Sequence, residues 1–295
     1  MLRIAVSLLV LTVSVSGQDL VSAEGLKESH TLKGGALQRM EVAQIVDENY
    51  RRQAIARERE RKKSTAAFPI WVVPTSANNP GLFGGVFFKT RIVLTNPTNL
   101  TFNVAAQVCG PNGVVDTRQI DLPANSSKVW DDFLGTAFGY SGPAAIEFDS
   151  WFIPVGGSSD YDFAVTAEVY TDSPNGRFKT TVVNGLAPDS VTGLNKTISA
   201  GVNVNSSERT NIGVYNESFL STMNVMARVF AGNVLVEVIT FSVPPKGWAQ
   251  KPLSAQVTNG TIEWTTDGSV YLWTVGVDNR SNDGTLSYPI FYLPP

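Results

Sequence analysis

The chain is 295 residues long, which leaves room for two domains with separate cores and excludes a single small domain. Charged residues make up only 17% of it, the formal net charge is −3, and residues 64–295 are mildly acidic. This composition excludes a broad basic face in that region, so nucleic-acid binding is not expected there.

Residues 1–23 have the pattern of a secretory signal peptide. Arg3 supplies the positive start, residues 4–16 form an apolar run, and small residues offer cleavage positions after it. The apolar run is shorter than the roughly 20 residues that span a bilayer. We therefore expect a secreted protein, extracellular or at the cell surface, with no membrane span after removal of the signal.

Residues 24–67 differ from the rest of the chain in their charge. Apolar residues recur at helical spacing between Leu37 and Tyr50, and alternating charges follow from Arg57 to Lys63. We expect this segment to be a charged helical or mobile arm. Three roles fit it: a solvated spacer, a segment removed during maturation, or an arm that binds a partner.

A β pattern begins near residue 68. Ile70, Trp71, Val72 and Val73 form a short apolar strand between two prolines, and prolines suit an edge position in a sheet. An edge strand can leave its own domain and pair with the open sheet of a neighbouring molecule. The segment near residues 68–77 is therefore a candidate for strand exchange between like subunits.

The chain repeats itself after about 120 residues. The eight residues from Lys89 (KTRIVLTN) match the eight from Arg209 (RTNIGVYN) without a gap. Further matches in the same order are Pro123 with Pro244, Lys128 and Trp130 with Lys246 and Trp248, and Ile146 and Glu147 with Ile262 and Glu263. We therefore expect β-sandwich domains at residues 68–195 and 196–295, each with about seven strands.

Alternation of apolar and polar residues predicts which side chains fill each core. Val104, Ala106 and Val108 correspond to Val225, Ala227 and Val229, and Phe163, Val165, Ala167 and Val169 correspond to Tyr271, Trp273, Val275 and Val277. One-sided burial on several short strands is typical of two antiparallel sheets packed face to face. The predicted fold class is all-β, with two tandem Ig-like or Greek-key sandwiches.

The two copies differ most between Glu147 and Phe163. The first copy carries the insertion DSWFIPVGGSSDYD at residues 149–162, where the second copy has only a short turn. Insertions on a repeated scaffold usually form loops, and loops often carry function.

Two ligand classes fit this insertion. Glu147, Asp149, Asp160 and Asp162 are candidate oxygen ligands for Ca²⁺, the one cofactor that the sequence suggests. Trp151 and Phe152 are candidates for stacking on a sugar ring. A solvated loop without a ligand is the alternative for both.

Three segments carry a family resemblance. They are WVVP at residues 71–74, KTRIVLTNP at residues 89–97 and RTNIGVYN at residues 209–216. They resemble tandem β-sandwich modules of secreted proteins from Acidobacteria and related bacteria. The resemblance covers residues 69–295. It implies a location outside the cell and a tandem sandwich architecture, and it implies no catalytic residue.

The chain is short of the residues on which most catalytic sites depend. His30 is the only histidine and precedes both predicted domains, so no Ser-His or Cys-His pair is expected within them. Cys109 is the only cysteine, and its place at a strand end predicts burial as a small apolar side chain.

These observations favour a non-enzymatic protein. The first hypothesis is a secreted module that makes adhesion, matrix or scaffold contacts with other surface or matrix proteins. The alternatives are a filament subunit that exchanges the segment near residues 68–77, and a carbohydrate-binding accessory protein whose partners are glycans.

Overall fold

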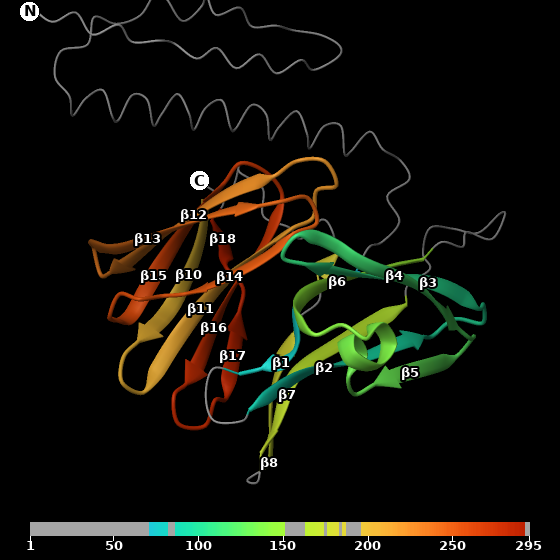
Figure 1. The fold of residues 1–295 in the computed structure, drawn as a ribbon. Helices are drawn as coiled ribbons and strands as arrows, with labels where there is room; N and C mark the ends of the chain where they lie inside the picture. Colours follow the sequence, from blue (N-terminus) through green and yellow to red (C-terminus); the bar gives the residue numbers. More distant parts are fainter. Residues whose placement is uncertain are drawn as a thin grey trace, which may run out of the picture. The chain divides into compact units, whose positions relative to one another are not determined.

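The computed structural model describes residues 71–81, 86–150, 163–173, 176–182, 185–186 and 196–292. Within these ranges every element except one short helix is a β-strand, and all strand pairs are antiparallel (Figure 1). The predicted all-β class is therefore confirmed, and the sheets are consistent with β-sandwich architecture. The predicted signal peptide, the arm at residues 24–67, Ile70 and the insertion from Trp151 to Asp162 lie outside the described residues.

In the described residues of the first repeat there are nine strands and the helix. They are β1 (Trp71–Pro80), β2 (Phe87–Asn96), β3 (Phe102–Gly110), β4 (Gly113–Leu122), β5 (Ser126–Trp130), η2 (Phe133–Phe138), β6 (Gly142–Ser150), β7 (Ala164–Ser173), β8 (Gly176–Val182) and β9 (Gly185–Leu186). The helix is a single six-residue turn, and nothing in the described part of the chain forms a helix long and apolar enough to cross a bilayer.

Residues 196–292 of the second repeat also form nine strands. They are β10 (Lys196–Val204), β11 (Glu208–Asn216), β12 (Met223–Ala231), β13 (Val234–Val243), β14 (Trp248–Pro252), β15 (Val257–Thr266), β16 (Val270–Asp278), β17 (Gly284–Ser287) and β18 (Ile290–Tyr292). The sequence predicted about seven strands in each copy, because the short strands that complete each sheet, such as β9 and β18, carry no pattern of their own.

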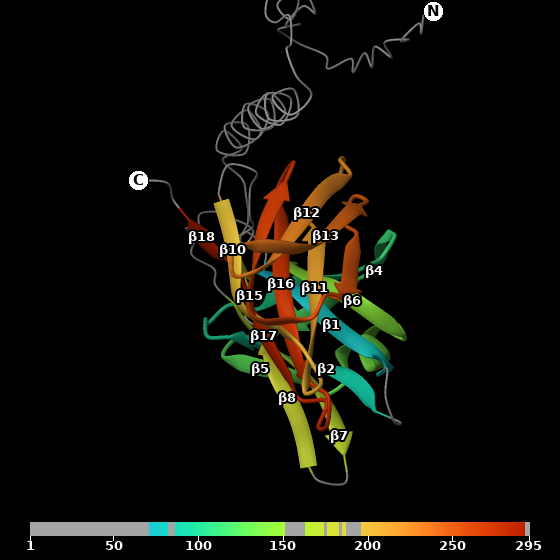
Figure 2. The same ribbon diagram turned by 90° about the vertical axis from the view of Figure 1, so that its left-hand side faces the viewer.

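The strands form the same two sheets in each repeat. In the first repeat, sheet A has the order β4-β3-β6-β1-β9 and sheet B joins β5, β2, β7 and β8, with a short β1–β2 pairing between them. In the second repeat, sheet C has the order β14-β11-β16-β17 and sheet D has the order β13-β12-β15-β10-β18. Sheet D thus repeats sheet A strand for strand, and sheet C repeats sheet B. Figures 1 and 2 show the strands of the two repeats from two sides.

Each repeat has its own apolar core between its two sheets. In the first repeat the core includes Ile92, Leu94, Val108 and Ile146. The equivalent side chains in the second repeat are Ile212, Val214, Val229 and Ile262. The predicted correspondence of these segments is confirmed by the register, because Val108 pairs with Ile146 as Val229 pairs with Ile262.

A buried asparagine closes the same turn in both repeats. The side-chain amide of Asn96 donates to the carbonyls of Leu100, Leu122 and Pro123. The amide of Asn216 donates to the carbonyls of Ser221, Val243 and Pro244. Each amide satisfies backbone groups where the chain leaves the sheet, which explains why this part of the repeat is the easiest to recognise in the sequence.

The correspondence predicted for strand β16 is wrong by one residue. Val93 of the first repeat pairs with Thr166, and its equivalent Gly213 pairs with Trp273, so Trp273 is the counterpart of Thr166 and not of Val165. A shift of one residue moves every side chain to the other face of a strand. Val270 and Leu272 therefore fill the second core, while Tyr271 and Trp273 point away from it.

The predicted match of Trp130 with Trp248 is also wrong. Ser126 pairs with Asn96, whereas the backbone of Gly247 accepts the hydrogen bond from the Asn216 N–H. The counterpart of Trp248 is thus Ser127, and that of Lys246 is Asn125. Asn125 and Lys246 also share a left-handed backbone, with φ of 48° and 54°.

The prolines that flank this segment predicted an edge position for strand β1, and this prediction is wrong. Trp71 and Val72 pair with β6 on one side and with β9 on the other, and Val73 pairs with Ile146. Pro74 is accommodated because the register shifts between Val73 and Ser76, and such bulges are among the few places where a sheet accepts proline.

Candidate functional site

The two repeats meet through the outer faces of sheets A and C. Sheet A contributes Val72, Cys109 and Ala145, and sheet C contributes Tyr215, Trp248, Tyr271 and Trp273, which together form a third buried cluster. The half-buried Val275, Leu286 and Tyr288 pack against it. We call this cluster, with Glu147 and Lys246, the inter-repeat site.

A glycine on the neighbouring strand leaves the space that the Trp273 side chain occupies. Gly213 pairs with Trp273, and a Cβ atom at Gly213 would lie 2.1 Å from the indole ring. The ring therefore lies flat over strand β11, where only glycine leaves room for it. In the first repeat the same pair is Val93 and Thr166, which needs no such space.

Trp248 joins the two repeats through a hydrogen bond. Its indole N–H donates to the carbonyl of Pro74 over 3.1 Å, and the bond is buried. Pro74 lies in the bulge of β1, where the ladder is interrupted. The second repeat therefore supplies a buried donor for a backbone carbonyl of the first repeat.

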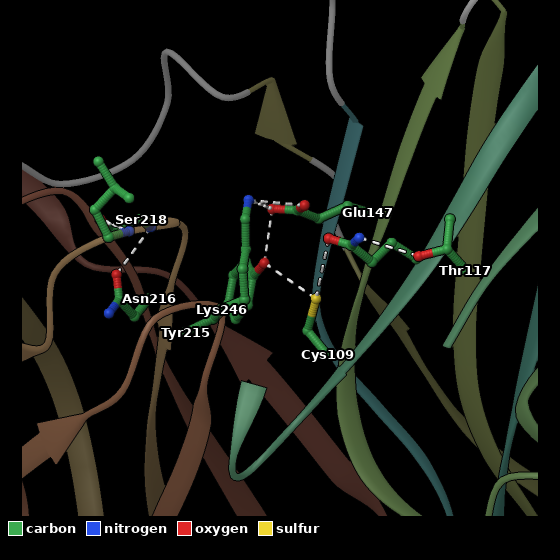
Figure 3. Close-up of polar contacts among 9 residues, drawn as sticks. Cys109, Thr117, Glu147, Tyr215, Asn216, Ser218 and Lys246 are labelled. Atoms are coloured by element: carbon green, nitrogen blue, oxygen red, sulfur yellow. Dashed lines mark hydrogen bonds and ion pairs between the residues drawn. The ribbon is translucent and has the colours of Figure 1, made fainter. Parts of the chain in front are cut away.

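A buried ion pair lies at the centre of the site (Figure 3). The ammonium of Lys246 donates to both carboxylate oxygens of Glu147, over 2.8 Å and 2.9 Å, and the hydroxyl of Tyr215 donates to the same carboxylate over 2.6 Å. All three residues are buried. A buried ion pair is tolerated only with such additional hydrogen bonds, because desolvation of both charges is costly.

The backbone around Lys246 directs its side chain to Glu147. Lys246 donates its backbone N–H to the carbonyl of Ser218, and its ammonium also lies 3.7 Å from the centre of the Phe219 ring. The left-handed conformation that lysine adopts here is uncommon for residues other than glycine and asparagine. Contact with Glu147 and Phe219 thus compensates for an unfavourable backbone.

Cys109 is buried beside this pair, as its sequence position predicted, but it faces away from the first core. Its sulfur lies 3.4 Å from the Tyr215 hydroxyl oxygen. Burial, and to a smaller extent the nearby Glu147 carboxylate, raise the pKa of the thiol from 9.0 to about 12. Burial is also the main cause that raises the pKa of the Tyr215 hydroxyl well above its ordinary value.

The polar groups of the site are engaged with one another. The charges of Glu147 and Lys246 neutralise each other, and the thiol of Cys109 is held in its unreactive form.

The predicted calcium ligands are only partly described. Glu147 and Asp149 lie two residues apart on β6 and so share a face of the strand, and Glu147 is engaged by Lys246. Asp160 and Asp162, like the candidate sugar-stacking residues Trp151 and Phe152, lie outside the described residues. Among the residues described, no group of three or more His, Cys, Asp and Glu side chains is arranged to hold a metal ion. Both sites stay predictions.

A groove of about 400 Å³ runs beside the inter-repeat site. Its walls include Phe88 and Val169 from the first repeat and Trp248, Val275 and Leu286 from the second. The charged side chains among its described lining residues are Lys179, Arg209 and Lys251. The groove is thus apolar along its walls and basic in charge.

Neither the family models nor the curated proteins with which the chain was compared match it. The resemblance to tandem modules of secreted bacterial proteins therefore stays a prediction, and the function has to be argued from the residues themselves.

Sequence reasoning missed the residues that join the repeats, although one signal was present. Strand β16 begins with Val-Tyr-Leu-Trp and shows no alternation, which is typical of a strand buried on both faces. A sheet that is covered on both faces needs a partner beyond its own sandwich. Lys246 and Tyr215 carry no comparable signal, because single polar residues in a turn or on a strand do not reveal a distant partner.

Proposed function

We propose that this chain is a secreted, non-enzymatic module in which two Ig-like β-sandwich domains act as one rigid unit and make adhesion, matrix or scaffold contacts. The observation that carries the proposal is the inter-repeat site, where aromatic packing, a buried ion pair and the Trp248–Pro74 hydrogen bond fix one repeat on the other. A rigid pair of domains presents its outer surfaces at a fixed spacing, which suits a protein that connects other surfaces.

The free surfaces of the module support a role in contacts. Large apolar side chains are exposed on β13, at Val234, Leu235, Val236 and Val238, and in the turn at Leu220. Exposed apolar groups that gather on one strand mark sites of protein–protein contact more often than scattered ones do. The export pattern of residues 1–23 supports a setting outside the cell for such contacts.

The experiment that tests the proposal follows the full chain in cells that produce it. Protease added to intact cells should digest the protein, and the purified protein should bind to isolated cell envelopes or matrix and saturate there. Protection from the protease in intact cells, together with absence from the medium, would refute export. Exported protein that does not bind envelopes, matrix or itself would refute the contact role.

A carbohydrate-binding role is a second candidate, and the groove beside Trp248 favours it. The Trp248 indole is almost entirely buried at the edge of the groove, so a sugar would be held there by hydrogen bonds from the amides of Asn79, Asn211 and Gln250. A glycan array tests it. Retained binding by a folded double variant, Asn79→Ala with Asn211→Ala, would exclude this groove as the site.

Strand exchange through the segment near residues 68–77 remains an alternative for assembly. In this structure Val72 and Val73 pair within their own chain, so exchange would first have to open the pairing with β6. Assembly by strand exchange should therefore be slow and should leave no monomer when it is complete, which size-exclusion chromatography over several days would reveal.

A further inference from the structure

Lys246 and Glu147 are two reactive side chains that the fold holds against each other. The Nζ atom of Lys246 lies 2.8 Å from one carboxylate oxygen of Glu147 and 2.9 Å from the other. A nitrogen this close to both oxygens is within about 3–3.5 Å of the carbon between them, which is the separation of two groups aligned for reaction. The two side chains are only 4% and 8% exposed, so bulk water is largely kept from the pair.

The two oxygens of the Glu147 carboxylate differ in their surroundings (Figure 3). Oε1 accepts hydrogen bonds from the Lys246 ammonium and from the Tyr215 hydroxyl, which is 2.6 Å away, and Oε2 accepts one from Lys246. The hydroxyl keeps its proton, because burial raises the pKa of Tyr215 well above its ordinary value. Tyr215 therefore supports negative charge on Oε1 and leaves Oε2 to the lysine.

Condensation of this pair would remove two charges from a buried site. Taking an ammonium and a carboxylate out of water is costly, and their mutual attraction only partly offsets that cost. An amide carries neither charge and keeps one donor and one acceptor. Exclusion of water also slows the hydrolysis that would reverse the reaction. The folded site thus favours an amide over the separated groups more than water does.

The chain has no disulfide that could fasten its repeats together. Cys109 is its only cysteine, and the thiol is free and buried. Many secreted proteins rely on covalent links that persist outside the cell. Lys246 and Glu147 lie 99 positions apart and belong to different repeats. A bond between these two side chains would link the first repeat to the second without any redox chemistry.

We propose that Lys246 and Glu147 condense after folding to an amide that joins the two repeats covalently. The ammonium passes one proton to Oε2, and the resulting amine attacks the carboxyl carbon. The new N–C bond forms and the bond to Oε2 breaks, while a second proton moves from the nitrogen to Oε2, which leaves as one molecule of water. The Tyr215 hydroxyl stabilises the charge that develops on Oε1, the oxygen that becomes the amide carbonyl. The step consumes no oxidant and no second reactant.

Mass spectrometry of the full chain, purified from the cells that produce it, tests the proposal. After denaturation and digestion with trypsin, the peptide that contains Glu147 should be joined to the peptide that contains Lys246, with the loss of one water. Trypsin should not cut after Lys246, because its amine is acylated. Separate peptides of unaltered mass would mean that the pair stays ionic and would overturn the proposal.

A second Lys–Glu pair provides a control in the same molecule. Nζ of Lys179 lies 2.7 Å from Oε1 of Glu168, but the lysine side chain is 53% exposed. Water hydrates this pair, so its peptides should be recovered without a link. A link at both pairs would show that condensation does not depend on the buried site, and the role assigned to that site would then be wrong.

Two variants separate the amine from the hydroxyl. Lys246→Arg keeps the cation but lacks the amine, so the intact variant should show no loss of water. Tyr215→Phe keeps the ring but lacks the hydroxyl, so in freshly synthesised chain the link should form about a hundredfold more slowly. A purely structural role of the hydroxyl would lower the melting temperature and leave this rate unchanged.

Each result counts for or against the link. A loss of water that persists in Lys246→Arg would place the reaction elsewhere in the chain and would overturn the proposal. If Lys246→Arg does not fold, as circular dichroism would show, the joined tryptic peptide of the unmodified chain still decides the question. An unlinked chain that binds cell envelopes would refute the amide and leave the proposed function standing.

Discussion

Sheets B and C share their strand order and their inward-facing residues, and they differ in what they show to the outside. Inward, Ile92 and Leu94 are matched by Ile212 and Val214. Outward, sheet B has Val93, Thr95 and Ser127 where sheet C has glycine, tyrosine and tryptophan. The inward set determines that a sandwich forms, and the outward set determines whether that sandwich stands in water or against another one.

The comparison predicts that substitutions which copy a residue of one repeat into the other will change the free energy of unfolding by unequal amounts. The largest is expected for Lys246→Asn, which installs the residue that the first repeat has in this turn. It relieves a strained backbone but leaves Glu147 buried without its cation, which costs about 3–5 kcal/mol. Chemical denaturation measures the loss.

The matched control is the reverse change, Asn125→Lys, in the exposed turn of the first repeat. It should lower the free energy of unfolding by only about 1 kcal/mol, because lysine is less suited than asparagine to the left-handed backbone at this position while its charge stays in water. A double variant, Glu147→Leu with Lys246→Met, should recover much of the stability lost by Lys246→Asn. Equal costs for Lys246→Asn and Asn125→Lys would contradict the role assigned to the ion pair.

A smaller effect is expected for Gly213→Val, which copies Val93. The new side chain would collide with the Trp273 ring and should cost about 1–3 kcal/mol in thermal or chemical unfolding. Adding Trp273→Thr, which completes the Val93–Thr166 pair of sheet B, should remove the collision but not restore the lost packing on sheet A. An additive effect of the two substitutions would argue against direct contact between these residues.

The last predicted effect on stability is a pH dependence caused by the thiol of Cys109. Because its pKa is raised from 9.0 to about 12, the folded protein holds this proton more tightly than the unfolded chain does. Its contribution to stability is therefore complete below about pH 9 and is lost as the pH rises from there toward about 12. Cys109→Ala should reduce the slope of unfolding free energy against pH in this range.

A thiol reagent gives an independent measurement on Cys109. At pH 8 the native chain should react at least a hundredfold more slowly than the chain in urea, since the thiol is buried. Rapid labelling without denaturant would show that the two repeats separate readily.

The inward-facing residues were largely predictable from the sequence, because alternation and the Asn96 and Asn216 turns repeat without gaps. The contact between the outer faces of sheets A and C was not predictable. A one-residue error in matching β16 placed Trp273 in the second core, and only the pairing of Gly213 with Trp273 corrects it. The ion pair joins residues 99 positions apart, and a charged residue in a turn gives no sign of a distant partner.

The position of Glu147 also bears on how the chain is made. Synthesis runs from the N-terminus, so the first repeat can fold before Tyr215, Lys246 and Trp248 exist. During that interval the face of sheet A is bare, and its carboxylate is hydrated. A charge at the centre of an otherwise apolar face discourages premature association with other nascent chains. The Glu147 carboxylate thus opposes association of sheet A with other chains during synthesis. Once Lys246 has been added, the same carboxylate helps to hold sheet C on sheet A.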